Sequence, residues 1–157
     1  MRGRWTEYTL PALRVALGLT FLVAGLTKLA DNMGFLGVIE NLRVVPSSLA
    51  PVVATSLPFV EIQCGLFLIG GLYTEAALGG AVALLVCFLG VTLVPLCQGR
   101  EVACGCFGVW ERITWFTPVR QAVMIGAALW CRSRPDVAKR FGFDAPSRQP
   151  GLPGGVH

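Results

Sequence analysis

Charged residues are scarce in this sequence, and their scarcity restricts the classes of protein to which it can belong. Asp, Glu, Lys and Arg make up 14% of the 157 residues, whereas soluble globular proteins carry about 25%. Hydrophobic residues reach 54%. A chain with this balance has lipid rather than water around much of its surface, so the composition predicts an integral membrane protein.

Histidine and methionine are also rare. The single histidine is His157, which excludes a histidine-based catalytic triad and a multi-histidine metal site in this sequence. The sequence has no internal repeat, glycine-rich phosphate loop or nucleotide-binding fingerprint. Its net charge of +4 does not indicate nucleic-acid binding, because the basic residues gather near the two ends of the sequence.

Long apolar runs predict an all-α integral membrane protein, with a four-transmembrane-helix bundle over residues 1–131. The expected spans are 10–30, 50–73, 76–97 and 113–131. A signal peptide is the rival interpretation of the first run, but that run lacks a small-x-small cleavage site. Residues 33–39 are expected to form a short interfacial helix, and Thr74-Glu75 a tight hairpin between the second and third spans.

The flanking Lys and Arg residues predict the orientation, since they favour the cytoplasmic side of a membrane. They are most frequent before the first span and after the fourth, so both termini are expected in the cytoplasm, with the chain in a bacterial inner membrane. The loops at 31–48 and 98–111 then face the periplasm. Residues 132–157 form a basic tail rich in proline and glycine, which we expect to be disordered.

Two cysteines separated by one glycine, Cys104 and Cys106, lie in the second periplasmic loop. A disulfide between them closes a small, strained ring, and strained disulfides are the more oxidising and labile ones. This pattern predicts a catalytic pair for thiol–disulfide exchange. Cys97, seven residues before Cys104, is expected either to resolve a mixed disulfide or to pack as a small hydrophobe.

The other cysteines carry weaker signals. Cys64 and Cys87 are expected at similar depth in two adjacent antiparallel helices, where they either meet or simply pack. Cys131 falls at the cytoplasmic end of the fourth span and is expected to be inert.

Three charged side chains fall within or beside the spans, namely Lys28, Glu61 and Arg120. A charge facing lipid is costly, so Glu61 and Arg120 should face the bundle interior, a partner or water, and pairing with each other would satisfy both. Glu61 either fixes helix packing or relays protons. Lys28 lies on the same side as the cysteine pair and would favour a thiolate there, unless it snorkels to the interface or is neutralised by Asp31.

The order of these motifs resembles the MauE family, within the wider DoxX-like group. The motifs are Phe21-x-x-x-Gly25-x-x-Lys28-Leu29, Leu57-Pro58-x-x-Glu61 and Cys104-Gly105-Cys106-Phe107-Gly108. Arg120 also looks like the arginine found early in that family's last helix. The resemblance implies a four-helix membrane protein that supports maturation of the disulfide-rich small subunit of methylamine dehydrogenase. It also implies work with a thioredoxin-fold partner in the periplasm.

We therefore expect a membrane thiol–disulfide oxidoreductase. One thiolate of Cys104 or Cys106 attacks, or receives a disulfide from, the thioredoxin-fold partner. Electrons then pass through Cys97 or directly to a membrane carrier, for which a quinone is the candidate cofactor by analogy with DsbB-type enzymes. The reverse electron flow uses the same residues.

Two other classes of function stay open. One is a soft-metal protein that binds or transports Cu or Hg through Cys104 and Cys106, with Cys64 and Cys87 as further ligands. The other is a non-catalytic membrane assembly factor that holds a client through its outer loops. The sequence does not indicate the oligomeric state.

Overall fold

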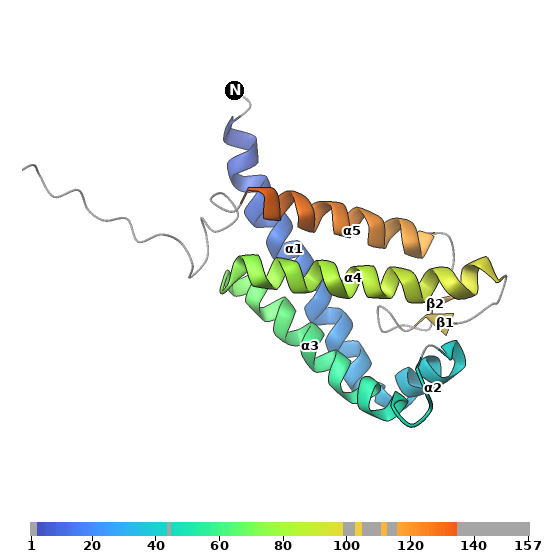
Figure 1. Cartoon of the computed structure of the whole chain (residues 1–157). Coiled ribbons are helices and arrows are strands. Elements are labelled where there is room, and N and C mark those ends of the chain that lie inside the picture. Colours follow the sequence, from blue (N-terminus) through green and yellow to red (C-terminus); the bar gives the residue numbers. More distant parts are fainter. Residues whose placement is uncertain (1–2, 44, 99–102, 105–110, 113–115, 135–157) are drawn as a thin grey trace, which may run out of the picture.

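The computed structural model describes residues 3–43, 45–98, 103–104, 111–112 and 116–134. For residues 3–7, 103–104 and 111–112, the backbone alone is described. Figure 1 shows the order of the elements, which are α1 (Gly3–Ala30), α2 (Asn32–Leu42), α3 (Ala50–Gly70), α4 (Thr74–Cys97), β1 (Ala103–Cys104), β2 (Glu111–Arg112) and α5 (Phe116–Ser133). The helical class expected from the sequence is confirmed, and the cytoplasmic tail expected at 132–157 lies largely outside the described residues.

Three of these helices are long and apolar enough to cross a membrane. They are the Tyr8–Ala30 part of α1, and α3 and α4 in full. The chain is therefore a multi-pass membrane protein. α5 has 18 residues and is not among the three, since it carries Arg120, Gln121 and Arg132 and is less apolar than α3 or α4. The fourth span thus stays a prediction.

The two short connections differ in detail from the expectation. α2 is present and extends the expected 33–39 helix at both ends, and the carboxylate of Asp31 caps it by accepting from the Gly34 N–H at 3.0 Å. α3 ends at Gly70 and is capped by Gly71, whose φ of 65° is left-handed. The tight turn therefore comes before Thr74, which starts α4, instead of at Thr74-Glu75.

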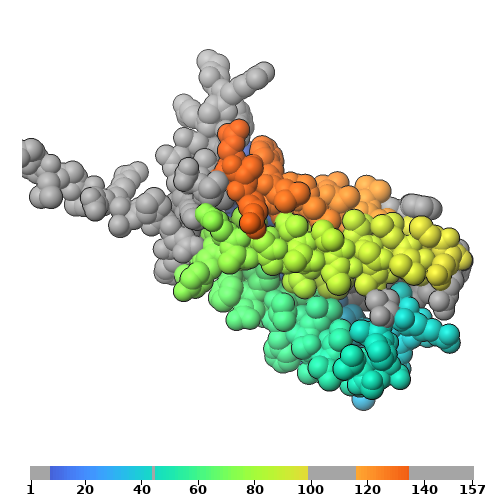
Figure 2. Space-filling model, viewed as in Figure 1, coloured from blue at the N-terminus to red at the C-terminus, as the bar shows by residue number. Residues whose placement is uncertain are grey.

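The helices form two closely packed pairs, α1 with α3 and α4 with α5. At one end of the bundle α3 turns into α4, and α1 meets α5, where the Cys131 thiol donates to the Leu10 carbonyl with Sγ and O 3.7 Å apart. From that end the two pairs diverge, as Figure 1 shows. In the face seen in Figure 2, α4 lies between α5 and α3. The other end carries α2 and the β1–β2 ladder (Figure 1), in which Cys104 is the partner of Glu111.

Glycines set the close approach of α1 to α3. A Cβ added at Gly65 would lie 2.7 Å from the carbonyl oxygen of Gly18, and one added at Gly18 would lie 2.9 Å from the carbonyl oxygen of Gly65. About two helical turns after Gly18, a Cβ added at Gly25 would lie 2.8 Å from the carbonyl oxygen of Pro58. Small residues allow membrane helices to pack backbone to backbone in this way. These contacts fix the register of the two helices.

A proline inside α3 explains how α2 is attached. Pro58 lacks the N–H that would bond to the carbonyl of Ala54 four residues earlier. Asn32, the first residue of α2, supplies the missing donor, with its Nδ2 3.0 Å from that carbonyl oxygen. A freed backbone carbonyl needs such a partner inside a membrane protein. Apolar packing completes the contact, with Phe35 and Ile39 of α2 buried in one cluster with residues of α3.

The glycine crossing can be tested by comparing two Gly→Ala variants. Gly65→Ala should destabilise the protein by about 1–3 kcal/mol, because the new methyl group must push a backbone carbonyl away. Gly80→Ala on α4 is the matched control, since a Cβ there has nothing within 4 Å. Denaturant unfolding in detergent, followed by circular dichroism, measures both. Equal stability of the two variants would contradict the close crossing.

Candidate functional site

A buried ion pair lies in the interior between α1 and α3. Nζ of Lys28 is 2.5 Å from Oε1 of Glu61, and each side chain is 1% exposed. Lys28 lies on the inward stripe of α1, whose members recur every three or four residues: Leu10, Arg14, Leu17, Phe21, Ala24 and Lys28. The helical period therefore turns the lysine inward, and the ion pair offsets much of the cost of burying two charges.

Two aromatic rings complete the surroundings of the lysine. Nζ of Lys28 lies 4.8 Å from the ring centroid of Phe88 on α4 and 5.5 Å from that of Phe35 on α2. The negative face of an aromatic ring attracts a cation at such distances, more strongly where water is excluded. One ammonium group on α1 thus contacts side chains from α2, α3 and α4.

The structure shows which contacts these charged side chains make. Glu61 pairs with Lys28 instead of Arg120. Lys28 is buried and does not snorkel to the interface, and Asp31 is exposed and caps α2. Arg120 is half-buried on α5, with its guanidinium 5.9 Å from the ring centroid of Phe116.

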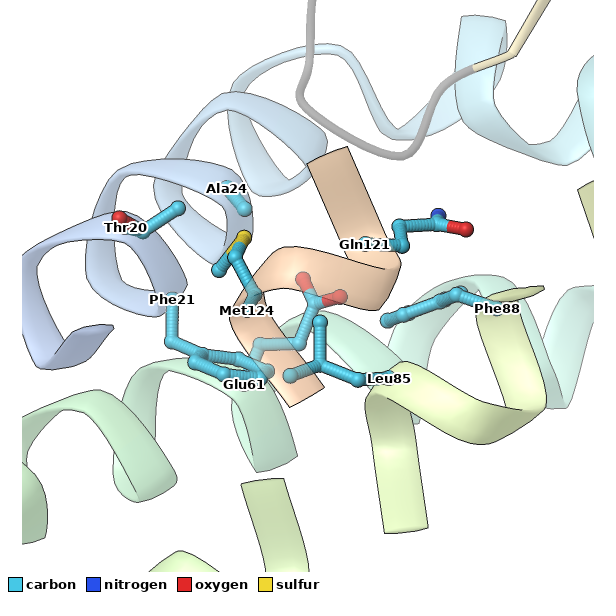
Figure 3. A pocket seen from close by; sticks show the side chains of 8 residues that line it. All are labelled: Thr20, Phe21, Ala24, Glu61, Leu85, Phe88, Gln121 and Met124. Atoms are coloured by element: carbon cyan, nitrogen blue, oxygen red, sulfur yellow. The ribbon is translucent and has the colours of Figure 1, made fainter. Parts of the chain in front are cut away.

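Beside the ion pair is a small cavity where side chains of α1, α3, α4 and α5 converge (Figure 3). Its lining includes Phe21, Ala24, Glu61, Phe88, Gln121 and Met124. Gln121 is 1% exposed, and its Oε1 lies 3.1 Å from the hydroxyl of Thr92 on α4, which donates to it. The cavity therefore has the carboxylate of Glu61 and the amide of Gln121 in a mainly apolar wall, which also includes Thr20, whose hydroxyl donates to the Ala16 carbonyl.

The cysteines are divided between the surface and the interior. Cys104 lies on β1, after α4 and at the end of the bundle that carries α2, whereas Cys106 lies outside the described residues. Cys97 is the exposed last residue of α4. The catalytic roles expected for these three residues stay predictions.

The remaining cysteines do not form a pair. Cys64 is buried, with its thiol donating to the Ala77 carbonyl at 3.4 Å, while Cys87 is exposed on α4. Cys131 is buried and bonded to the Leu10 carbonyl. Within the described part of the chain, no three His, Cys, Asp or Glu residues gather as metal ligands.

Several residues of this site were not found from the sequence. Gln121 carried a usable signal, because a buried amide in an apolar helix is costly unless it has a partner. Arg14, a 1% exposed residue of α1 outside this site, carried the same kind of signal. Phe35 and Phe88 carried none, since an aromatic side chain in an apolar run is ordinary.

The coupling of Lys28 and Glu61 can be measured by a double-mutant cycle. Lys28→Met and Glu61→Leu should each cost about 3–5 kcal/mol of stability, because each leaves an uncompensated buried charge. The double variant should recover most of that loss, since it buries no charge. Glu40→Gln, at an exposed position on α2, is the control and should be neutral. Additive losses in the double variant would show that the two residues do not interact.

Comparison with known proteins places the chain in a family. The sequence profile of the family described as "Methylamine utilisation protein MauE" matches residues 6–133. The chain is similar to the methylamine utilization protein MauE of Paracoccus denitrificans (36% identity over 121 residues) and of Paracoccus versutus (37% over 125 residues), covering 75% of this chain and 65% of each relative.

A third relative is the methylamine utilization protein MauE of Methylophilus methylotrophus, at 28% identity over 123 residues, with 76% of this chain and 65% of the relative covered. The chain thus spans about 65% of the length of these curated relatives. No solved structure gives a significant match. The profile match over residues 6–133 confirms the expected family: this chain belongs to the MauE family.

Proposed function

We propose that this member of the MauE family is a membrane thiol–disulfide redox protein that acts at the periplasmic face through Cys104 and Cys106. The observation that supports it most is the location of Cys104 on β1, beyond the apolar helix α4 and at the same end of the bundle as α2 (Figure 1). Exposed Cys97 ends α4. Buried Cys64 and Cys131, in contrast, are bonded to backbone carbonyls inside the bundle.

The exchange follows ordinary thiol–disulfide chemistry. A thiolate of the partner attacks the Cys104–Cys106 disulfide and forms a mixed disulfide. A second partner thiolate then attacks that bond, so the partner leaves oxidised and the CxC pair is left as a dithiol. Return to the disulfide releases two electrons and two protons, which pass through Cys97 or directly to a membrane quinone that becomes a quinol.

The family name suggests the setting of this chemistry. Relatives are called methylamine utilization proteins, and we propose that the client is a secreted, disulfide-rich protein such as the small subunit of methylamine dehydrogenase. A thioredoxin-fold periplasmic protein would carry the disulfide between them. Lys28 and Glu61 have a structural part in this proposal. Their ion pair holds α1 against α3 in the half of the bundle nearer to α2, the end at which Cys104 lies.

The proposal also includes an orientation in a bacterial inner membrane, with both termini on the cytoplasmic side. α5 packs against α4 and returns to the end where α1 begins, so that Cys131 meets Leu10. Arg132 and Arg134 follow at that end and are exposed. Positive residues favour the cytoplasm, which supports two cytoplasmic termini and α5 as a fourth span.

Trapping of thiols in intact cells tests the proposed exchange. Cys106→Ser and Cys104→Ser should each shift the periplasmic partner to its reduced form, because neither variant can form the disulfide that the partner thiolate attacks. Alkylation with a heavy maleimide and a gel shift detect it. Cys87→Ser, which removes an exposed thiol of α4, is the control and should behave as the wild type.

A CxC pair that never changes redox state would contradict the oxidoreductase proposal. Stoichiometric Cu(I) binding that is lost in Cys104→Ser/Cys106→Ser would favour a soft-metal protein instead. Normal client maturation in that double variant would favour a non-catalytic assembly factor. An impermeant maleimide that fails to reach Cys104 from outside would reverse the orientation.

A further inference from the structure

We propose that Glu61 and Gln121 bind a single water molecule inside the bundle. The water completes a polar chain that joins the α1–α3 pair of helices to the α4–α5 pair. This inference does not depend on the thiol chemistry, because it rests on the ion pair and the cavity beside it.

The carboxylate of Glu61 is satisfied on one side alone. Oε1 accepts from Lys28, whereas Oε2 is buried and has no hydrogen-bond partner among the described residues. A buried carboxylate oxygen without a partner costs more than an ordinary unmade hydrogen bond, since the group carries charge. Because Glu61 lines the cavity (Figure 3), a molecule in that space is within the reach of its carboxylate.

The amide of Gln121 is in the same situation. Its Oε1 accepts from the Thr92 hydroxyl, and its Nε2 is buried with no partner in the described part of the chain. The Thr92 hydroxyl also lies 3.0 Å from the Leu89 carbonyl, so its single proton serves one acceptor at a time.

Exchanging the two amide atoms of Gln121 would let Nε2 donate to Thr92 and free that hydroxyl for the Leu89 carbonyl. The exchange would leave Oε1 as the amide atom without a partner. A polar atom of Gln121 is therefore left over in either assignment. Water both donates and accepts, so it satisfies this atom in both cases.

The size and chemistry of the cavity fit one water. It offers about 10 Å³ to the centre of a water molecule, which is close to the minimum that one water needs. Buried waters usually make about three hydrogen bonds to polar groups that would otherwise be unsatisfied. Two such groups, one from α3 and one from α5, line this cavity. An apolar ligand would leave both of them unpaired.

With the water in place, hydrogen bonds run from Lys28 on α1 through Glu61 on α3 and the water to Gln121 on α5 and Thr92 on α4. Each pair of helices is held together mainly by its own close packing. The water thus forms a polar junction between the pairs in the region where they diverge, and it gives the Glu61 carboxylate a hydrogen-bond donor besides Lys28.

X-ray radiolysis of the full-length protein in detergent tests this site with water itself as the probe. A bound water yields hydroxyl radicals in place, and these oxidise the methionine beside it. Met124 lines the cavity and is the reporter, while Met33, which is 80% exposed on α2, is the internal reference. We expect Met124 to be oxidised in the wild type.

Two substitutions should lower Met124 oxidation relative to that of Met33, because Met124 is half-buried and the bound water is its nearest source of radicals. Ala24→Leu fills the cavity, and Gln121→Leu removes one partner of the water while nearly conserving volume. Gln63→Leu is the matched control, because it removes an exposed amide from α3 and should leave Met124 oxidation intact. Unoxidised Met124 in the wild type, or equal oxidation in folded Ala24→Leu, would overturn the proposal. Circular dichroism establishes that each variant is folded.

Discussion

The ion pair between Lys28 and Glu61 is the interaction on which the rest of this structure depends. It places a positive and a negative charge in an apolar interior, where neither is tolerated alone. The phenyl rings of Phe35 and Phe88 face the same ammonium group, so α2 and α4 are drawn to the junction of α1 and α3. Such a pair does not necessarily add stability over an apolar core, but it penalises every arrangement in which the two residues are apart.

The geometry of the α1–α3 crossing explains why these two residues meet. Gly18 and Gly65 bring the backbones together, and side chains on a helix lean toward its N-terminus. In antiparallel helices, Lys28 therefore leans into the bundle while Glu61 leans back toward the end with α2. The redox proposal builds on this crossing, since it holds together the helices at the end of the bundle where the β1–β2 ladder with Cys104 lies. A bound water at Glu61 would connect this crossing to α5 and α4.

Apolar length was enough to predict α3 and α4 to within a few residues and the end of α1, whose start at Gly3 lies well before the predicted residue 10. The short helix expected at residues 33–39 is present as part of α2. The partner of Glu61 was not predictable, because depth estimated along each helix ignores the lean of long side chains and places Lys28 too close to the surface. The role of Asn32 depends on the carbonyl that Pro58 leaves free, which only tertiary structure brings within reach. Composition alone does not show whether α5 spans the membrane, because a hydropathy window counts Gln121 as polar although its amide is buried and bonded to Thr92 of α4. Cys106 lies outside the described residues, so its role still rests on sequence alone.

The most direct test of this account is a solid-state NMR measurement between Lys28 and Glu61 in lipid bilayers. The sequence contains two lysines, Lys28 and Lys139, so Lys139→Arg leaves one ¹⁵Nζ signal to observe. With ¹³Cδ-labelled glutamate, dipolar recoupling should show strong dephasing of that signal, and Glu61→Gln made with unlabelled glutamine should abolish it. Dephasing of the Lys28 signal that is equally strong in Glu61→Gln, or no dephasing in the parent protein, would show that the buried ion pair does not exist.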